Sequence, residues 1–322
     1  MLAQVLLNKP DAVRRSLTGF LVIMAAVILF FLGVSGAWLG RLAPSLAPFL
    51  EANPVSGRAL GSLVIALAMF ANWKAFLFLP RRWQVIGIWI ELFALLMAFF
   101  YSFDLSLSFI ASKVGFMVSQ GVLTTLYISA ISIALATLFA LIGALAKLSG
   151  SGIAYGLSTF YTSLFRGLPL LMQIYLIYLG LPQVGYVIGA IPAGVLALSL
   201  CYGAYMTEIF RAGIESIPRG QSEAATALGL KPSLTMALVV LPQAMRVIIP
   251  PTGNQFISML KDSSLVSVVG VWELMYLART LGQSEFRHIE MLITASMIYW
   301  GLSIGLEMLQ ARLERHFRRS AR

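Results

Sequence analysis

The residues of this sequence that could take part in chemistry are few, and they form no catalytic set. Two histidines, His288 and His316, and one cysteine, Cys201, are too few for a metal cluster. No paired carboxylates, activated nucleophile or phosphate-cradling loop of the form G-x-x-x-x-G-K-[ST] stands in the sequence. We therefore expect no catalytic residue, no metal, no cofactor and no ATP site, and we interpret Cys201 as a small core residue.

Two ionisable residues stand deep within otherwise apolar stretches. An intramembrane charge costs about 2.5–3.5 kcal/mol on insertion scales, so Glu91 and Arg166 are functional candidates. For Glu91 we favour a structural partner, Lys74 or Arg82, over a ligand contact. Arg166 has two interpretations, a role in a gate or in helix packing, and a snorkelling position at a cytoplasmic entrance.

A second polar group combines a cation, an anion and hydroxyls. Lys261 and Asp262 are adjacent in the chain and are followed by Ser263 and Ser264. On a membrane surface such an ion pair contributes little free energy. Inside a membrane protein the same four side chains offer binding groups for a charged, polar ligand.

The elements that position these residues are membrane helices. The 322 residues are 59% hydrophobic and 11% charged, whereas a soluble domain carries about a quarter charged residues. Apolar runs long enough to cross a bilayer recur along the chain. We expect an all-α, polytopic bundle of about eight transmembrane helices at 17–39, 59–79, 84–103, 116–146, 154–180, 187–207, about 241–260 and 290–311.

The distribution of basic residues orients this bundle. The formal net charge is +10, and alternating spans place fourteen Lys and Arg on the side of the N-terminus and five on the other. The positive-inside rule then puts both termini in the cytoplasm and explains the charge without a nucleic-acid partner. The span at 17–39 is too long for the apolar region of a signal peptide, so we expect it to be retained.

The chain changes character near residue 110. The first three spans are bulky and rich in Phe, Leu and Trp. Later spans carry small polar residues and are interrupted by prolines. Such features suit a translocation pathway and equally suit a tightly packed bundle. We predict an N-terminal membrane extension at 1–114, a second membrane domain at 115–312 and a basic cytoplasmic tail at 313–322.

The polar segment 208–242 between the sixth and seventh spans is predicted to be cytoplasmic. Ser222 is a candidate N-cap with Glu223 in the first turn of a helix. Gly229 is a natural helix stop, and Pro232 blocks continuation. We expect a short amphipathic helix of two to three turns that links two membrane helices.

The spacing in this segment resembles the cytoplasmic motif of ABC-importer permeases. That motif reads Glu-Ala-Ala, three residues, Gly, nine residues, Ile-x-Leu-Pro. Here it is matched by Glu223-Ala224-Ala225, Gly229 and Val239-Val240-Leu241-Pro242, with Val replacing Ile. The resemblance implies that this loop is the coupling helix that docks on an ATPase subunit. The positions assigned to this coupling loop are Gly220, Gln221, Glu223, Ala224, Ala225, Gly229, Leu241 and Pro242.

The flanking residues resemble the polar amino-acid branch of that family over about 115–312. The matching segments are 165–173, 203–211, 241–244, 250–255 and 261–265. The resemblance implies a five-helix permease core, with the first three spans outside it. It also implies a substrate path or gate for which the candidates are Arg166, Gln173, Asn254, Lys261, Asp262, Ser263 and Ser264.

The resemblance also implies the partners. These are ABC ATPase subunits, a second permease copy or a homologous permease, and a periplasmic substrate-binding protein, in the bacterial inner membrane. The permease would cross the lipid bilayer and carry a polar amino acid by alternating access, with ATP hydrolysed in a separate subunit. Glutamine, glutamate, histidine, arginine and opines remain equally open as substrates. The alternative is an ion-gradient-driven secondary amino-acid transporter, and the docking motif argues against it.

Overall fold

The computed structural model describes residues 11–31, 33, 45, 47–101, 103 and 105–319, and all regular secondary structure among these residues is helical. Side chains are described for these residues except 11–20, 101 and 316–319. By its internal contacts the chain divides into two units, 1–99 and 100–322. Each unit is described by itself.

The first unit is a group of helices with little buried interior. It contains α2 (Asp11–Phe31), α4 (Ala47–Ala52), α5 (Pro54–Leu77) and most of α6 (Arg81–Tyr101), and α2 packs on α5. Glu91 of α6 accepts two hydrogen bonds of 2.9 Å from the side-chain amide of Asn72 on α5. Glu91 therefore has a structural partner, as expected, but the partner is Asn72. The two cations expected there lie against aromatic rings instead, Lys74 over Phe70 and Trp73 and Arg82 over Trp83.

The second unit begins with a long helix and a bent one. Helix α7 (Leu107–Phe116) continues through a π-helical segment, η2 (Met117–Val122), into α8 (Leu123–Leu148). Helix α9 (Gly152–Gly167) follows, and then α10 (Leu170–Tyr175), η3 (Leu176–Gly180) and α11 (Leu181–Gln183). The axes of α9 and the α10–α11 segment differ by 106°.

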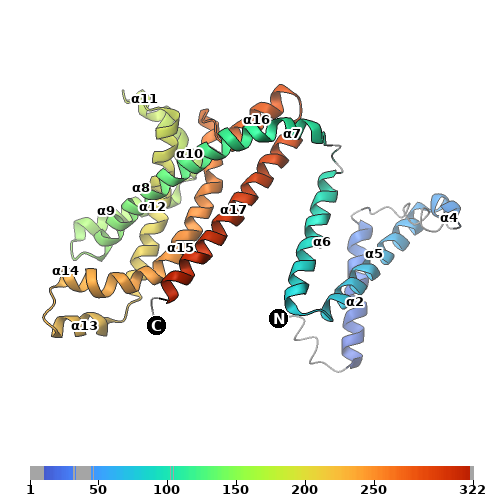
Figure 1. The fold of residues 1–322 in the computed structure, drawn as a ribbon, viewed down its shortest axis with the longest axis horizontal. Helices are drawn as coiled ribbons and strands as arrows, with labels where there is room; N and C mark the ends of the chain where they lie inside the picture. The colour runs from blue at the N-terminus through green and yellow to red at the C-terminus, as the bar shows by residue number, and fades with distance from the viewer. Residues whose placement is uncertain are drawn as a thin grey trace. The chain divides into compact units, whose positions relative to one another are not determined.

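The remaining helices complete the packed core (Figure 1). They are α12 (Ala190–Glu215), α13 (Arg219–Ala227), α14 (Pro232–Thr235) with η4 (Met236–Val240), α15 (Leu241–Asp262) with η5 (Ser263–Val269), α16 (Leu274–Ser284) and α17 (His288–Arg319). Helix α12 packs against α8, α9 and α15, and α15 packs against α17. Helices α13 and α16 lie at opposite ends of the unit in Figure 1.

Small residues allow α8 and α12 to pack closely. A Cβ atom added to Gly143 of α8 would lie 2.5 Å from Oγ1 of Thr207 on α12. A Cβ atom added to Gly203 of α12 would lie 3.2 Å from the carbonyl oxygen of Ala136. Thr125, Ser129 and Ser132 of α8 are fully buried, and the carbonyl of Ser132 accepts a hydrogen bond from the hydroxyl of Ser199 on α12. These side chains therefore serve helix packing, the second of the two interpretations drawn from the sequence.

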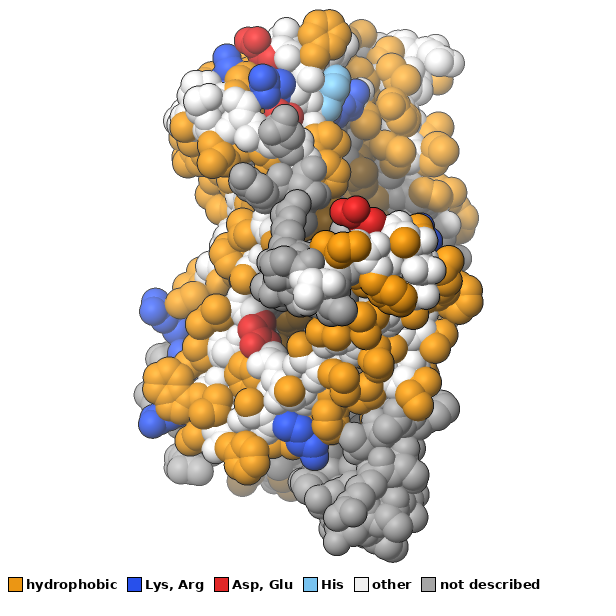
Figure 2. Space-filling view, turned by 90° about the vertical axis from the view of Figure 1, so that its right-hand side faces the viewer, with side chains coloured by type: hydrophobic (Ala, Val, Ile, Leu, Met, Phe, Trp, Pro, Cys, Tyr) orange, Lys and Arg blue, Asp and Glu red, His pale blue; other side chains and the backbone are white. Residues whose placement is uncertain are grey.

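Six helices of the described residues are long and apolar enough to cross a membrane, or seven if the bent pair counts as one span. Hydrophobic side chains dominate the face seen in Figure 2, as expected for a surface in contact with lipid. The prediction of an all-α, multi-pass membrane bundle is confirmed. The count of eight stays a prediction, because the span at 17–39 lies partly outside the described residues.

Candidate functional site

A break in the chain between α9 and α10 forms one wall of a cavity. Pro169 restricts the preceding residue, and Leu168 is extended at φ −91° and ψ 138°, which ends α9. The amide of Gln173 is 3% exposed and donates two hydrogen bonds of 2.9 Å, to the carbonyls of Phe165 and Leu168. Gln173 thus satisfies backbone groups that the break leaves without helical partners.

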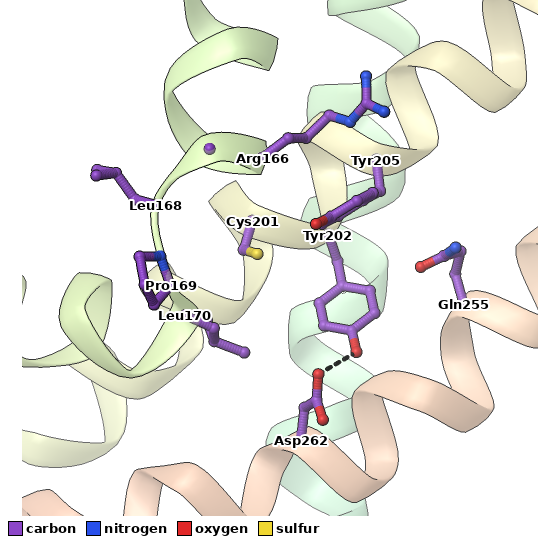
Figure 3. A pocket seen from close by; sticks show the side chains of 10 residues that line it. Arg166, Leu168, Pro169, Leu170, Cys201, Tyr202, Tyr205, Gln255 and Asp262 are labelled. Atoms are coloured by element: carbon purple, nitrogen blue, oxygen red, sulfur yellow. Dashed lines mark hydrogen bonds between the residues drawn. The ribbon is translucent and has the colours of Figure 1, made fainter.

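The cavity has a volume of about 430 Å³, and Figure 3 shows the side chains that line it. Residues of α9, the break, α12 and α15 line it: Arg166, Gly167, Leu168, Pro169, Leu170, Cys201, Tyr202, Tyr205, Gln255 and Asp262. The hydroxyl of Tyr202 donates a 2.7 Å hydrogen bond to Asp262 Oδ2. The guanidinium of Arg166 lies 5.3 Å from the ring centre of Tyr205. The cavity therefore carries a cation, a carboxylate, hydroxyls and an amide.

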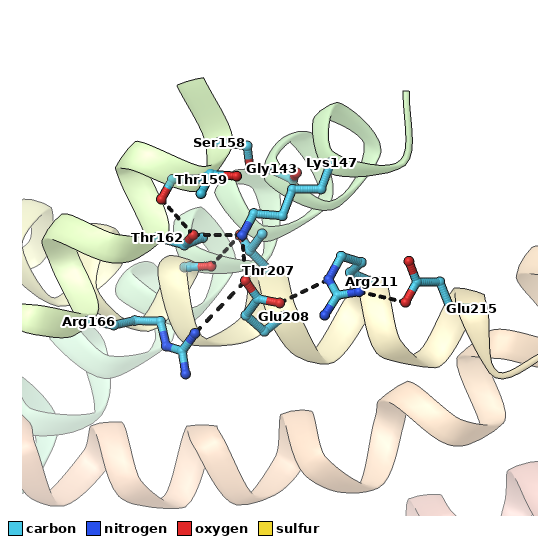
Figure 4. Close-up of polar contacts among 11 residues, drawn as sticks. Gly143, Lys147, Ser158, Thr159, Thr162, Arg166, Thr207, Glu208, Arg211 and Glu215 are labelled. Atoms are coloured by element: carbon cyan, nitrogen blue, oxygen red, sulfur yellow. Dashed lines mark hydrogen bonds and ion pairs between the residues drawn. The ribbon is translucent and has the colours of Figure 1, made fainter. Parts of the chain in front are cut away.

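A charge network adjoins the cavity and ties together α8, α9 and α12 (Figure 4). Lys147 Nζ donates to Thr162 Oγ1 at 2.8 Å and to Glu208 Oε1 at 2.5 Å. Arg211 donates to Glu208 Oε2 at 3.0 Å and to Glu215 Oε2 at 2.6 Å.

Arg166 is the loosest member of this network. Its Nη1 lies 3.9 Å from Glu208 Oε1, and its side chain is 43% exposed. Glu208 already accepts hydrogen bonds from Lys147 and Arg211, and the network holds three cations against two carboxylates. Arg166 is therefore available to an anionic group that enters the cavity.

The other predicted path residues lie elsewhere in the fold. Asn254 is exposed and its amide oxygen lies 3.1 Å from Gln310 Nε2, on the side of α15 that meets α17. Lys261 is exposed and does not line the cavity. Ser263 is buried and donates to the carbonyl of Leu260, and Ser264 is half-buried at the start of η5. Of the predicted candidates, the cavity brings together Arg166 and Asp262.

Sequence reasoning did not assign Cys201, Tyr202, Tyr205 and Gln255 to the path. The three α12 residues stand at helical spacing on one face of an apolar helix, a pattern that usually means packing. The signal that distinguishes them is the tyrosine hydroxyl of Tyr202 within a span, because a buried hydroxyl needs a polar partner.

The predicted coupling loop contains a helix of nine residues, α13, which agrees with the predicted length of two to three turns. Its start differs from the prediction. Pro218 occupies the N-cap position, so Ser222 and Glu223 lie inside the helix and not at its first turn. Gly220, Gln221, Glu223, Ala224 and Ala225 all stand on α13, and only Ala225 is buried.

The end of α13 follows the expected pattern. Gly229 adopts φ +77°, the N–H of Leu230 donates to Ala225 and that of Gly229 to Thr226. These two bonds form a Schellman motif, in which glycine avoids the strain of a left-handed residue. Leu241 and Pro242 then begin α15.

One hydrogen bond joins α13 directly to the helix that lines the cavity. Gln243 Nε2, in the first turn of α15, donates to Gln221 Oε1 on α13 at 3.0 Å. Farther along the same helix, Gln255 and Asp262 face the cavity. Helix α15 therefore connects the exposed loop with the polar cavity.

Comparison with known proteins places this core among transport proteins. Residues 139–319 match the family described as binding-protein-dependent transport system inner membrane component. The arginine transport system permease protein ArtQ of Bacillus subtilis (strain 168) is 38% identical over 197 residues, which are 61% of this chain and 90% of that protein. The L-cystine transport system permease protein TcyB of the same organism is 38% identical over 63% of this chain and 87% of that protein.

The similar solved structures are also of transport proteins. A chain of a crystal structure of an amino acid ABC transporter with histidines is 34% identical and superposes with a TM-score of 0.62, covering 66% of this chain and 99% of that chain. The MetNI methionine ABC transporter in an inward-facing conformation, at 20% identity and a TM-score of 0.55, shares the fold.

Proposed function

The chain belongs to the family of binding-protein-dependent transport system inner membrane components, and from this premise we propose that it is the permease subunit of an ATP-driven importer of polar amino acids. The observation that carries the proposal is the cavity of the second unit, which Arg166 and Asp262 both line. A zwitterionic amino acid presents one carboxylate and one ammonium group. Arg166 would hold the carboxylate, and Asp262 the ammonium group.

The loop at 219–242 supports the proposed mechanism of coupling. Helix α13 exposes Glu223 and Ala224 at one end of the unit, where they are available to a separate ATPase subunit. The hydrogen bond between Gln221 and Gln243 connects that surface to α15. ATP would be hydrolysed in the partner, and this chain would move the substrate without bond chemistry.

The domain roles and further partners complete the proposal. Residues 115–312 form the transport domain, residues 1–114 an extension and residues 313–322 a basic tail. A second permease copy or a homologous permease would close the path, and a substrate-binding protein would deliver the amino acid. The protein would reside in the bacterial inner membrane with both termini in the cytoplasm, as the distribution of basic residues supports.

The proposal is tested by uptake into vesicles that contain the full complex purified from its native membrane. L-Arginine, L-histidine, L-glutamine, L-glutamate and octopine are supplied one at a time with the binding protein. We expect ATP-dependent uptake of at least one of them, unaffected by ionophores that collapse ion gradients. Uptake that needs an ion gradient and no ATP would establish the secondary transporter instead, an alternative that gains no support from the relatives.

A further inference from the structure

Helix α15 contains a weak point between its two functional ends. Pro250 and Pro251 stand inside the helix and lack the N–H groups that would donate to the carbonyls four residues earlier. Two consecutive losses in the hydrogen-bond ladder make this turn the easiest place for the helix to bend. We call Leu241–Ile249 the lower segment of α15 and Thr252–Asp262 the upper segment.

A glutamine of α17 fastens the helix at this weak point. Gln310 Nε2 lies 3.0 Å from the carbonyl oxygen of Pro250, 3.1 Å from Asn254 Oδ1 and 2.8 Å from Glu314 Oε1. Its two amide hydrogens serve these three acceptors, so the group is held from both sides. The contact is also close, because a Cβ atom added to Gly253 would lie 2.6 Å from the Gln310 side-chain carbonyl carbon.

The two segments of α15 contact different parts of the transport machinery. The lower segment bonds to α13 through Gln243 and Gln221, and Ile248 packs against Gly213 near the end of α12. The upper segment carries Gln255 and Asp262 into the cavity. Movement of α13 that is transmitted along α15 therefore crosses the turn at Pro250 and Pro251 before it reaches Gln255 and Asp262.

We propose that Gln310 is a positioning residue that holds the proline turn of α15 against α17 and so makes it a fixed pivot. With the pivot fixed, displacement of the lower segment by α13 tilts the upper segment and moves Asp262 relative to Arg166. Without the hydrogen bonds of Gln310, the two segments of α15 slide along α17, and displacement of α13 no longer moves Asp262. This inference rests on the proposed function for its coupling step. The fastening itself is independent of that function.

The fastening is tested on the full chain in lipid nanodiscs by amide hydrogen exchange. Gln310→Met keeps the length of the side chain and removes its donors. We expect exchange in peptides covering 246–256 to become roughly 3- to 10-fold faster, because one anchoring interaction is lost. The matched control is Gln84→Met, since Gln84 also donates a 2.8 Å bond to a backbone carbonyl, that of Leu79 in the first unit. Unchanged exchange at 246–256 in Gln310→Met would overturn the proposal.

The coupling role is tested on the reconstituted complex by the ratio of amino acid transported to ATP hydrolysed. We expect Gln310→Met to lower this ratio at least ~5-fold while ATP hydrolysis continues, and Gln84→Met to leave it unchanged. Replacing both Pro250 and Pro251 with Ala closes the helix ladder, so Gln310→Met should have little further effect in that background. An unchanged ratio in Gln310→Met, or an equal additional loss in the alanine background, would overturn the pivot. Absence of ATP-coupled uptake in the wild-type complex would instead contradict the proposed function.

Discussion

Arg166 takes part in two arrangements at once, since it lines the cavity and also lies near Glu208. The ion pair with Glu208 at 3.9 Å and the cation–π contact with Tyr205 hold the guanidinium without saturating its five donors. A charged residue inside a membrane protein usually faces an ion partner, water or a ligand, and such positions mark candidate substrate paths. Its position thus agrees with the proposed contact to a substrate carboxylate.

Replacing Arg166 with Met should therefore weaken substrate binding. A hydrogen bond to a charged group contributes about 1.5–3 kcal/mol, so we expect KM for uptake to rise roughly 10- to 150-fold. The matched control is Arg211→Met, because Arg211 also pairs with Glu208 but does not line the cavity. If the two variants raise KM equally, Arg166 acts only through the charge network.

Glu273 is a buried carboxyl that anchors the start of α16. It is 0% exposed and accepts hydrogen bonds from the N–H groups of Met275 and Tyr276 and from the hydroxyl of Tyr299. Burial raises the pKa of this carboxyl to about 7 from an ordinary 4.5, although the hydrogen bonds oppose the shift. The folded state therefore binds a proton more tightly than the unfolded state does.

This shift predicts a pH dependence of stability with a definite sign. Because the folded pKa is the higher one, the contribution of Glu273 to the free energy of unfolding is fully present below about pH 4.5 and falls by roughly 3 kcal/mol as pH rises to about 7. Glu273→Gln cannot titrate, so the Tm advantage of the wild type over this variant should shrink across that window. The measurement is Tm of the full chain in detergent from pH 5 to 8. Glu285→Gln, at an exposed carboxyl, is the control, and parallel curves for wild type and Glu273→Gln would contradict the assignment.

At the scale of single residues, the sequence indicated which residues are important more accurately than it indicated their contacts. Arg166 was identifiable because a charge within an apolar stretch is rare, and Asp262 because it stands beside a lysine and two serines. Gln173 and Asn254 carry polar groups of the same kind, but one closes the break after α9 and the other meets Gln310 of α17. Those contacts depend on neighbours far along the chain or on an interrupted helix, so spacing alone could not reveal them.

Among the elements, α13 shows how a short helix is defined by its end. Its C-terminal Schellman motif requires a left-handed residue, and Gly229 at φ +77° provides it without a Cβ clash. The sequence predicted this stop correctly. It misplaced the start by several residues, because Pro218 at the N-cap position outweighed the capping preference of Ser222.

Gly229→Val should accordingly distort the proposed docking loop. A left-handed conformation costs a non-glycine residue about 1–2 kcal/mol, and more for a β-branched one. We expect weaker retention of the ATPase subunit during purification and a several-fold loss of ATP-dependent uptake. Gly150→Val is the control, because a Cβ atom there meets nothing within 4 Å and its backbone lacks the left-handed conformation. Equal losses in both variants would show that the loop does not depend on Gly229.

The bent pair α9 and α10–α11 marks the limit of hydropathy as a predictor of elements. The apolar run at 154–180 predicted one span, whereas the helix axis turns by 106° at Gly167–Pro169. Hydropathy reports which residues avoid water and contains no information on direction. Pro169 indicated that the helix is interrupted. The angle depends on two contacts, the hydrogen bond of Tyr161 to α12 and the hydrogen bonds of Gln173 to the carbonyls at the break.

At the scale of the whole molecule, the two units differ in how they bury their residues. In the second unit, two thirds of the residues in the most apolar stretch of α12 are buried. In the first unit, none of the residues in the corresponding stretch of α6 is buried. Composition predicted membrane helices in both units, since lipid and protein interior favour the same side chains. Only the small polar residues of the second unit distinguished a packed core from helices that face lipid.

Removing the first unit should leave transport largely intact. The match to ArtQ covers 90% of ArtQ but 61% of this chain, and the match to TcyB covers 87% of TcyB but 63% of this chain. A complex containing residues 105–322 should therefore assemble and take up substrate within about twofold of the full chain, as expected of an independent domain. Uptake and expression level are measured together, so that loss of insertion is separated from loss of activity. If the truncated chain inserts normally and its complex takes up no substrate, the first unit contributes directly to transport, and the proposed transport domain is incomplete.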